Sequence, residues 1–145
     1  NIIVRHCFKG TYPEGLGRIV MLAPPNQPPK LADTFEDHPL YQAITRDAGR
    51  KLASTDFYAS LPTPTVPFGI IAGDKGQKLT FKEPNDGVVA VRETKLAGSA
   101  DFLLLHHTHT FMMNAKDTAM QCGHFLQHGA FVRSLAGTAA GQDDP

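Results

Sequence analysis

The sequence contains no tryptophan, only two cysteines and no long apolar run. A helix needs about 20 consecutive apolar residues to span a bilayer, whereas the longest runs here, such as RIVMLAPP and FGIIAG, are under ten residues. Cys7 and Cys122 are far apart and lie in no paired metal-binding spacing, which argues against a disulfide framework and a zinc motif. We expect a soluble protein with two buried thiols, and its compartment stays open with the cytoplasm slightly favoured.

An excess of charge of one sign is also lacking, because fourteen Lys and Arg residues balance fourteen Asp and Glu residues. Binding to nucleic acid or to an anionic membrane surface depends on an excess of positive charge. The remaining composition, 41% hydrophobic and 19% charged, is that of an ordinary globular domain with one core. We therefore expect one domain with neither of those partners, and the oligomeric state is left open.

The chain begins with NIIVRHCF, which has the pattern of the middle of a helix. Ile3 and Cys7 are spaced at i and i+4, and Gly10 supplies a stop signal. Neither an initiator methionine nor a signal peptide opens the sequence. We expect a helix over residues 2–9 and further polypeptide upstream of it.

Three short apolar runs predict strands that are buried on both faces. They cover Arg18–Ala23, Val66–Asp74 and Ala100–His107. Such runs are typical of parallel sheets. Between the first two runs, residues 26–65 predict a proline-rich loop and two or three short helices, which we interpret as a cap-like insertion.

An amphipathic helix is predicted after the third run. Its expected buried stripe repeats at spacings of 3, 4, 3 and 4 and consists of Met112, Ala115, Ala119, Cys122 and Leu126. Gly129 supplies the stop, and residues 137–145 are expected to be a disordered tail. The alternation of elements over residues 1–136 predicts the α/β class, with a parallel sheet that binds ligands at the carboxyl ends of its strands.

Three histidines lie at the end of the third run or just after it: His106, His107 and His109. His109 lies beyond the last apolar residue, just before the predicted helix. A histidine that acts as a general base needs a carboxylate to hold one tautomer and to stabilise the imidazolium. Two candidates precede it: Asp86 in NDGVVAV, and Asp74 at the end of IIAGD. The serine motif G-x-S-x-G, which would complete a catalytic triad, is absent.

At this point the residues resemble a known family. Over nearly its whole length the chain resembles the C-terminal half of an α/β-hydrolase of the bacterial lipase and esterase kind. NIIVRHCF resembles the helix after the nucleophile elbow, and RIVMLAPPN and GIIAG resemble the next two strands. DGVVAVRETKL is similar to the segment that carries the triad acid, and HTHTFMM to the segment that carries the triad histidine.

The resemblance implies a partial α/β-hydrolase fold in which Asp86 is the orienting acid and His109 the general base. It places the serine and the oxyanion-hole donors upstream of Asn1. It also implies a small-molecule ester or lipid substrate and no metal or organic cofactor. Pro28-Pro29 and TRDAG depart from the family's usual residues and bear on the geometry of the cap.

Other interpretations of the same residues stay open. His109 could bond to the backbone at a strand end, and Asp86 could only form a turn, since Asp-Gly is a common turn pair. A histidine metal site is disfavoured because His106 and His107 should point to opposite faces of a strand. His124 and His128, one helical turn apart, are the other close histidine pair. A noncatalytic α/β module that binds small molecules is the alternative to an enzyme.

Overall fold

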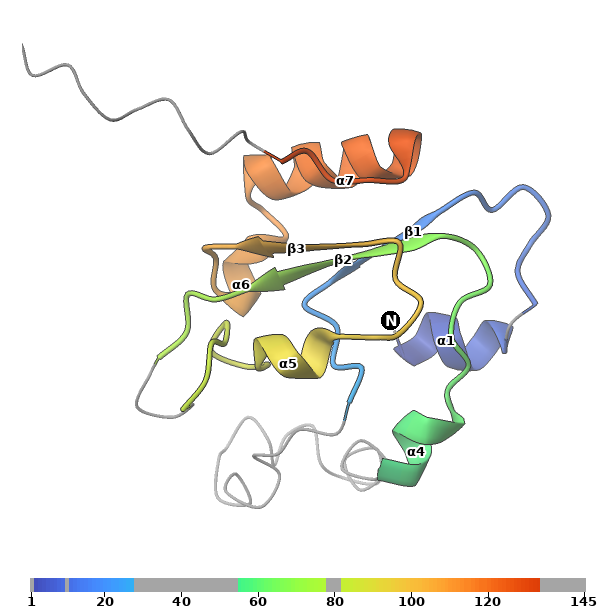
Figure 1. Cartoon of the computed structure of the whole chain (residues 1–145), viewed down its shortest axis with the longest axis horizontal. Coiled ribbons are helices and arrows are strands. Elements are labelled where there is room, and N and C mark those ends of the chain that lie inside the picture. The colour runs from blue at the N-terminus through green and yellow to red at the C-terminus, as the bar shows by residue number, and fades with distance from the viewer. Residues whose placement is uncertain (1, 10, 28–54, 78–81, 134–145) are drawn as a thin grey trace, which may run out of the picture.

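The computed structural model of the chain describes residues 2–9, 11–27, 55–77 and 82–133. The centre of this part is a small parallel sheet with flanking helices (Figure 1). Its strands lie in the order β1-β2-β3 and comprise β1 (Ile19–Leu22), β2 (Phe68–Gly73) and β3 (Asp101–Leu105). The α/β class and the parallel strands are therefore confirmed, and each strand lies within the apolar run that predicted it.

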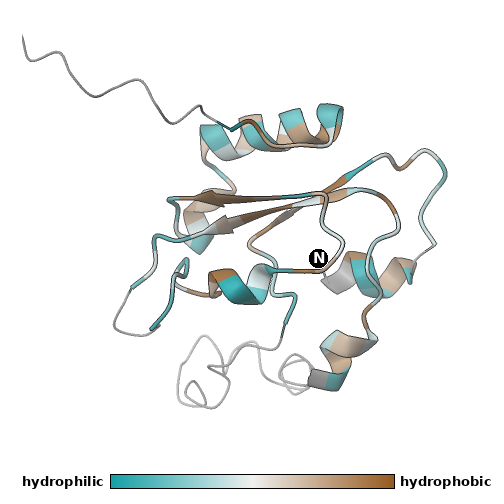
Figure 2. Cartoon of the chain, in the orientation of Figure 1, coloured by the Kyte–Doolittle hydropathy of each residue, from teal (hydrophilic) through white to brown (hydrophobic). Residues whose placement is uncertain are grey.

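The strand register places all three carboxyl ends at one edge of the sheet. Leu22 of β1 is opposite Ile71 of β2, and Gly73 of β2 is opposite Leu105 of β3. All six residues of the central strand β2 are buried, and Figure 2 shows the apolar colour concentrated on β2 and β3. Burial on both faces is the reason that this strand reads as a continuous apolar run instead of an alternating one.

Helices lie on both sides of the sheet. In Figure 1, α7 lies on one side, while α1, α4 and α5 lie on the other. The described helices are α1 (Ile2–Phe8), α4 (Thr55–Ser60), α5 (Val91–Thr94), α6 (His109–Met112) and α7 (Lys116–His128). None of them is long and apolar enough to cross a bilayer.

The core on the α7 side depends on a close approach between helix and sheet. Phe125 of α7 and Phe131 pack against each other with ring centroids 4.9 Å apart, and both side chains are buried. A Cβ on Gly69 of β2 would lie 2.6 Å from the Phe125 ring and 2.8 Å from that of Phe131. Glycine at position 69 therefore lets the aromatic pair rest directly on the sheet.

Behind the sheet, the buried Arg5 joins several segments that are distant in sequence. Its guanidinium donates to the carbonyl oxygens of Leu61 (2.7 Å) and Pro62 (2.9 Å) and to the side-chain oxygen of Asn26 (3.1 Å). Burial lowers the pKa of Arg5. Asn26 in turn donates to the carbonyl of Thr94 (2.8 Å), so α1, the end of β1, the approach to β2 and the end of α5 are held together.

The single amphipathic helix predicted near the C-terminus is two helices in the structure, and a different face of the second one is buried. It is split into α6 and α7, and the buried residues of α7 are Thr118, Gln121 and Phe125, whereas Leu126 is exposed. The larger Phe125 occupies the core beside β2, which turns the neighbouring Leu126 outward. The stop at Gly129 is confirmed, since this residue ends α7 with a positive φ of 81°.

The two thiols also differ from expectation. Cys7 on α1 is exposed and Cys122 on α7 is half-buried, so the prediction of two buried thiols is wrong. Burial raises the pKa of Cys122. The predicted stop at Gly10, most of the cap-like insertion 26–65 and the tail 137–145 lie outside the described residues; within the insertion, α4 is the helix that is described.

Candidate active site

The loops that leave the carboxyl ends of β2 and β3 carry the predicted site residues. Asp74 directly follows β2, and Asp86 lies in the segment that leads from β2 to α5. His106 directly follows β3, and His109 is the first residue of α6. Since parallel strands end at the same edge, these side chains from distant parts of the sequence meet there.

Asp86 and His109 are in direct contact. The Nδ1 atom of His109 lies 2.7 Å from Oδ2 of Asp86, and the backbone N–H of His109 donates to the backbone carbonyl of Asp86 at 2.9 Å. The carboxylate is buried, with 1% of its side chain exposed, while the imidazole is 34% exposed. In the described part of the chain the other ring nitrogen, Nε2, has no hydrogen-bond partner.

A tight turn fixes the orientation of the Asp86 carboxylate. Its Oδ1 accepts hydrogen bonds from the backbone N–H groups of Val88 (2.9 Å) and Val89 (2.7 Å). Gly87, between Asp86 and Val88, has a φ of 97°, a conformation that favours glycine. Asp86 is thus a turn former and a histidine partner at once, because each of its two oxygens serves one of these purposes.

Two neighbours of this turn are absent from the sequence-based prediction. Asn85 is buried; its side-chain amide donates to the carbonyl of Glu83 (2.9 Å) and its Oδ1 accepts from Gly87 N–H (2.9 Å). Gly73, the last residue of β2, is the second: a Cβ there would lie 2.5 Å from the carbonyl oxygen of His107 and 2.9 Å from Cβ of Asp86. The glycine at the end of GIIAG was the available signal, because it permits the two loops to approach.

The other two histidines are paired with different carboxylates. Nδ1 of His106 lies 2.8 Å from Asp74, and Nε2 of His107 lies 2.8 Å from Asp117 at the start of α7. The partners belong to different elements. Both histidines lie beyond the end of β3, so the predicted alternation across a strand does not apply to them. Asp74, the alternative acid, contacts His106 and not His109, and sequence reasoning missed Asp117.

The His106–Asp74 and His107–Asp117 pairs are more exposed to solvent than the carboxylate of the Asp86–His109 pair. The side chain of His106 is 75% exposed and that of Asp117 is 49% exposed. Ion pairs in such surroundings contribute little to stability, because water and salt screen them. The Asp86 carboxylate, by contrast, is removed from water, so its bond to His109 is the one that is held in a fixed geometry.

The charge of Asp86 acts on the protonation of His109. The hydrogen bond to the Asp86 carboxylate raises the pKa of His109, and the partial burial of the ring opposes that effect. A carboxylate can only accept a hydrogen bond, so the neutral imidazole carries its proton on Nδ1 and a lone pair on Nε2. The pair can therefore accept a proton at Nε2 and stabilise the imidazolium that results.

Apolar side chains follow His109 along α6. Phe111 is 69% exposed and Met113 is 66% exposed, whereas Met112 is buried against the core. The predicted burial of Met112 is confirmed, whereas the adjacent Met113 lies outside the core. Met112 packs with Ile71 of β2, while Phe111 and Met113 on either side of it are exposed apolar side chains that follow His109 in the sequence.

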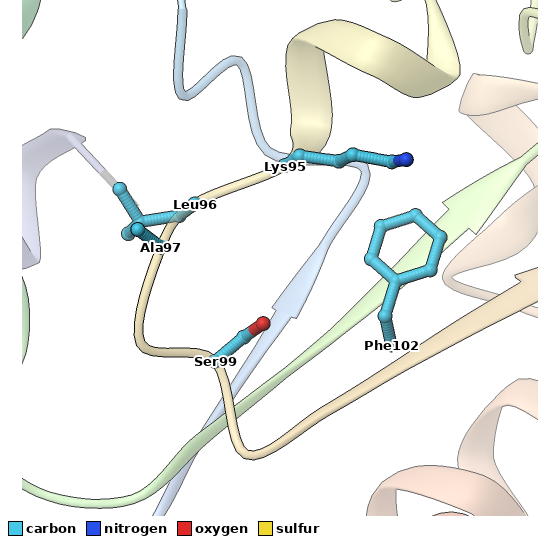
Figure 3. Close-up of a pocket in the computed structure, with 5 residues that line it drawn as sticks. All are labelled: Lys95, Leu96, Ala97, Ser99 and Phe102. Atoms are coloured by element: carbon cyan, nitrogen blue, oxygen red, sulfur yellow. The ribbon is translucent and has the colours of Figure 1, made fainter.

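Of the two serines that the structure describes, Ser60 and Ser99, neither is hydrogen-bonded to His109. Ser60 donates its hydroxyl to the carbonyl of Phe57 at 2.7 Å. Ser99 lines a pocket of about 390 Å³ with Lys95, Leu96, Ala97 and Phe102 (Figure 3). That pocket lies at the start of β3, so a five-residue strand, roughly 15 Å long, separates it from His109. Ser54 and Ser134 lie outside the described residues.

A metal-binding cluster is not found in the described ranges, where no group of three or more His, Cys, Asp and Glu side chains is placed to hold an ion. Comparison with known proteins adds no relative, because no family model, curated protein or solved structure matches the chain. The chemistry of the site itself must therefore indicate what it does.

Proposed function

We propose that this chain is the C-terminal portion of a serine hydrolase that cleaves carboxylic esters. Asp86 and His109 would be two members of a Ser-His-Asp triad, and the serine would belong to polypeptide upstream of Asn1. The observation that supports this most is the 2.7 Å bond between a buried carboxylate and Nδ1 of a histidine whose Nε2 is left for another partner. Its position at the carboxyl edge of a parallel sheet is where α/β enzymes place their reactive groups.

In the proposed reaction His109 moves a proton in two steps. Nε2 takes the proton of the serine hydroxyl while the oxygen attacks the ester carbonyl carbon. The imidazolium then returns this proton to the alkoxide that leaves, which yields an acyl-serine and an alcohol. A water molecule repeats the sequence on the acyl-serine and releases the acid, and upstream backbone N–H groups stabilise the oxyanion in both halves.

Asp86 has two tasks in this mechanism. Its bond to Nδ1 holds the tautomer in which Nε2 is unprotonated, and its charge stabilises the imidazolium of the transition state. The raised pKa of His109 is in agreement with the second task. Because the base acts in its neutral form, the acid limb of the pH profile of kcat/KM should lie above that of an ordinary histidine.

The surroundings of His109 favour esters with apolar acyl chains. Phe111 and Met113, which follow His109 in the sequence, are exposed apolar side chains of the same segment and support this choice. In the resembled family a helical cap covers such a site, and most of the segment that would form it, residues 26–65, lies outside the described residues. The proposal accordingly covers lipid-like esters, including acylglycerols, as substrates.

The test uses the longer protein. We expect a G-x-S-x-G motif within about ten residues upstream of Asn1. The substitution His109→Ala should then lower turnover of a p-nitrophenyl ester by at least about a thousandfold without unfolding the domain. His106→Ala is the matched control, because His106 is exposed and paired with Asp74, and it should change turnover by less than about twofold. Turnover that survives His109→Ala would overturn the proposal.

A second candidate function is a noncatalytic module that binds small molecules. One observation favours it: among the described residues no hydroxyl contacts Nε2 of His109, so the pair as described has no nucleophile. A fluorophosphonate probe separates the two functions, since it reacts covalently only with an activated serine. Labelling of the longer protein that is lost in His109→Ala supports the hydrolase, and a protein that is never labelled supports the binding module.

A further inference from the structure

A second histidine pair lies at the other end of the helix that follows the candidate active site. His124 and His128 occupy the last turn of α7, with ring centroids 4.2 Å apart and an angle of 24° between the ring planes. Residues four apart on a helix share one face. Both rings therefore project from the same part of the surface, and neither belongs to the Asp86–His109 pair.

Hydrogen bonds fix the same tautomer in both rings. Nδ1 of His124 lies 2.8 Å from the carbonyl oxygen of Ala130, and Nδ1 of His128 lies 3.0 Å from that of His124. A carbonyl oxygen can only accept a hydrogen bond, so in each neutral ring Nδ1 carries the proton. Each Nε2 is then left with a lone pair, and within the described part of the chain neither Nε2 has a hydrogen-bond partner.

The turn that follows α7 positions the backbone carbonyl that accepts the hydrogen bond from His124. Gly129 adopts a left-handed conformation, with a φ of 81°, and its N–H donates to the carbonyl of Phe125 at 2.7 Å. This turn brings the carbonyl of Ala130 to the His124 ring. Histidine ligands of metals are commonly held in the same way, because a backbone carbonyl that accepts from one ring nitrogen orients the other.

We propose that His124 and His128 together bind a divalent first-row transition metal ion through their Nε2 atoms. A metal lies about 2.0–2.1 Å from an imidazole nitrogen, so two nitrogens that occupy adjacent positions around it are about 3 Å apart. The rings are stacked, with centroids 4.2 Å apart and planes inclined at 24°, so both rings must turn about their side-chain bonds before the two Nε2 lone pairs point at one ion. The ion would bridge the last helical turn, and water would complete its coordination.

The choice of ion follows from the ligands. Imidazole nitrogen suits Ni²⁺, Cu²⁺ and Zn²⁺, and of these Cu²⁺ binds most tightly to a given nitrogen site. The carbonyl oxygens of Leu126 and Gln127 accept hydrogen bonds from Arg18, at 2.8 and 3.2 Å, so they are already engaged. Two protein ligands with water make an exchangeable site, unlike a structural zinc centre with four protein ligands.

The experiment is a calorimetric titration of the full chain with Ni²⁺. All proteins carry Cys7→Ser, because the exposed thiol of Cys7 is an alternative ligand. We expect one Ni²⁺ to bind, and His124→Ala and His128→Gln each to weaken the binding at least about tenfold. The double variant should be no weaker than the weaker single variant, because removing either ring already destroys the chelate.

Two further measurements make the result decisive. Ni²⁺ should raise the unfolding midpoint of the parent protein and not that of the single variants, since the chelate exists only in the folded helix. His128→Gln keeps a good helix former at position 128, so the circular dichroism of this variant shows whether α7 persists.

His106→Ala is the control and should leave the affinity for Ni²⁺ unchanged. A parent protein that binds no Ni²⁺, or a single variant that binds it with the parent's affinity, would overturn the proposal.

Discussion

The substitution Asp86→Asn tests the candidate site most directly, because it removes one charge and keeps the shape of the side chain. The Asn oxygen can still accept from the N–H groups of Val88 and Val89, so the turn is retained. The Asn amide then faces Nδ1 of His109, where the carboxylate oxygen was 2.7 Å away. Two N–H donors cannot bond to each other, so the ring is expected to move its proton to Nε2. In that tautomer it can no longer act as a base.

The expected loss of stability follows from the exposure of the two groups. A hydrogen bond to a charged group contributes about 1.5–3 kcal/mol. The carboxylate is buried but the imidazole is 34% exposed, so screening by water reduces the effect to about 1–2 kcal/mol. Asp86 raises the pKa of His109, and its contribution is therefore complete at pH values below the ordinary histidine pKa. As the pH rises through the raised pKa of the folded state, this contribution is lost.

Two measurements on the chain check these expectations. Urea unfolding in mild acid should show the full difference between the parent protein and Asp86→Asn, and the difference should narrow in mild alkali. The ¹⁵N chemical shifts of the imidazole nitrogens should show a lower pKa for His109 in the variant, together with the change of tautomer. The matched control is Asp74→Asn, since Asp74 pairs with the exposed His106; it should cost less than about 1 kcal/mol and leave His109 unchanged.

One result would refute the reasoning. If His109 of Asp86→Asn titrates as in the parent protein and still keeps its proton on Nδ1, then Asp86 controls neither the charge nor the tautomer of the ring. The catalytic roles proposed for both residues would then have no basis in their contact.

Two further predictions concern the residues that hold the loops of the site. Gly73→Ala should destabilise the fold by about 1–3 kcal/mol, because the new Cβ would lie 2.9 Å from Cβ of Asp86; urea unfolding measures this, and Gly17→Ala, with open space around it, should change stability by less than about 0.5 kcal/mol. Asp117→Asn should cost less than about 1 kcal/mol. The hydrogen bond to His107 lowers the pKa of Asp117, so the contribution of this pair is present above the ordinary Asp pKa and is lost as the pH falls through the lowered one. Equal stability losses in the Asn variant at neutral pH and in strong acid would contradict this assignment.

The local sequence was enough to predict the strands. Each of the three apolar runs is short and ends at turn residues, which is typical of a strand in a parallel sheet. The prediction of burial on both faces is confirmed for β2 and wrong for β1 and β3, where Leu22 and Leu104 are exposed. The rule that parallel strands end at one edge then indicated where histidine and aspartate would meet. The left-handed end of α7 at Gly129 was equally readable, because glycine adopts a positive φ at little cost.

Periodicity was less reliable for the C-terminal helix, where side-chain size decided the buried face. The predicted stripe chose Leu126, yet Phe125 is buried, since the bare surface at Gly69 of β2 accepts its aromatic ring. Met113 is exposed although it directly follows the buried Met112, because α6 ends at Met112. Spacing along one segment carries no information about the shape of the surface that the segment packs against.

The sequence by itself determined the α/β class, the three strands and the candidates for chemistry, which are His109 with either Asp86 or Asp74. Only the tertiary structure decided which carboxylate each histidine meets, because Asp74, Asp86 and Asp117 are all near enough along the chain to be partners. The choice depends on the approach of two loops at the end of β2, and on which carboxylate that approach removes from water. These are properties of packing between distant segments, which no local pattern encodes.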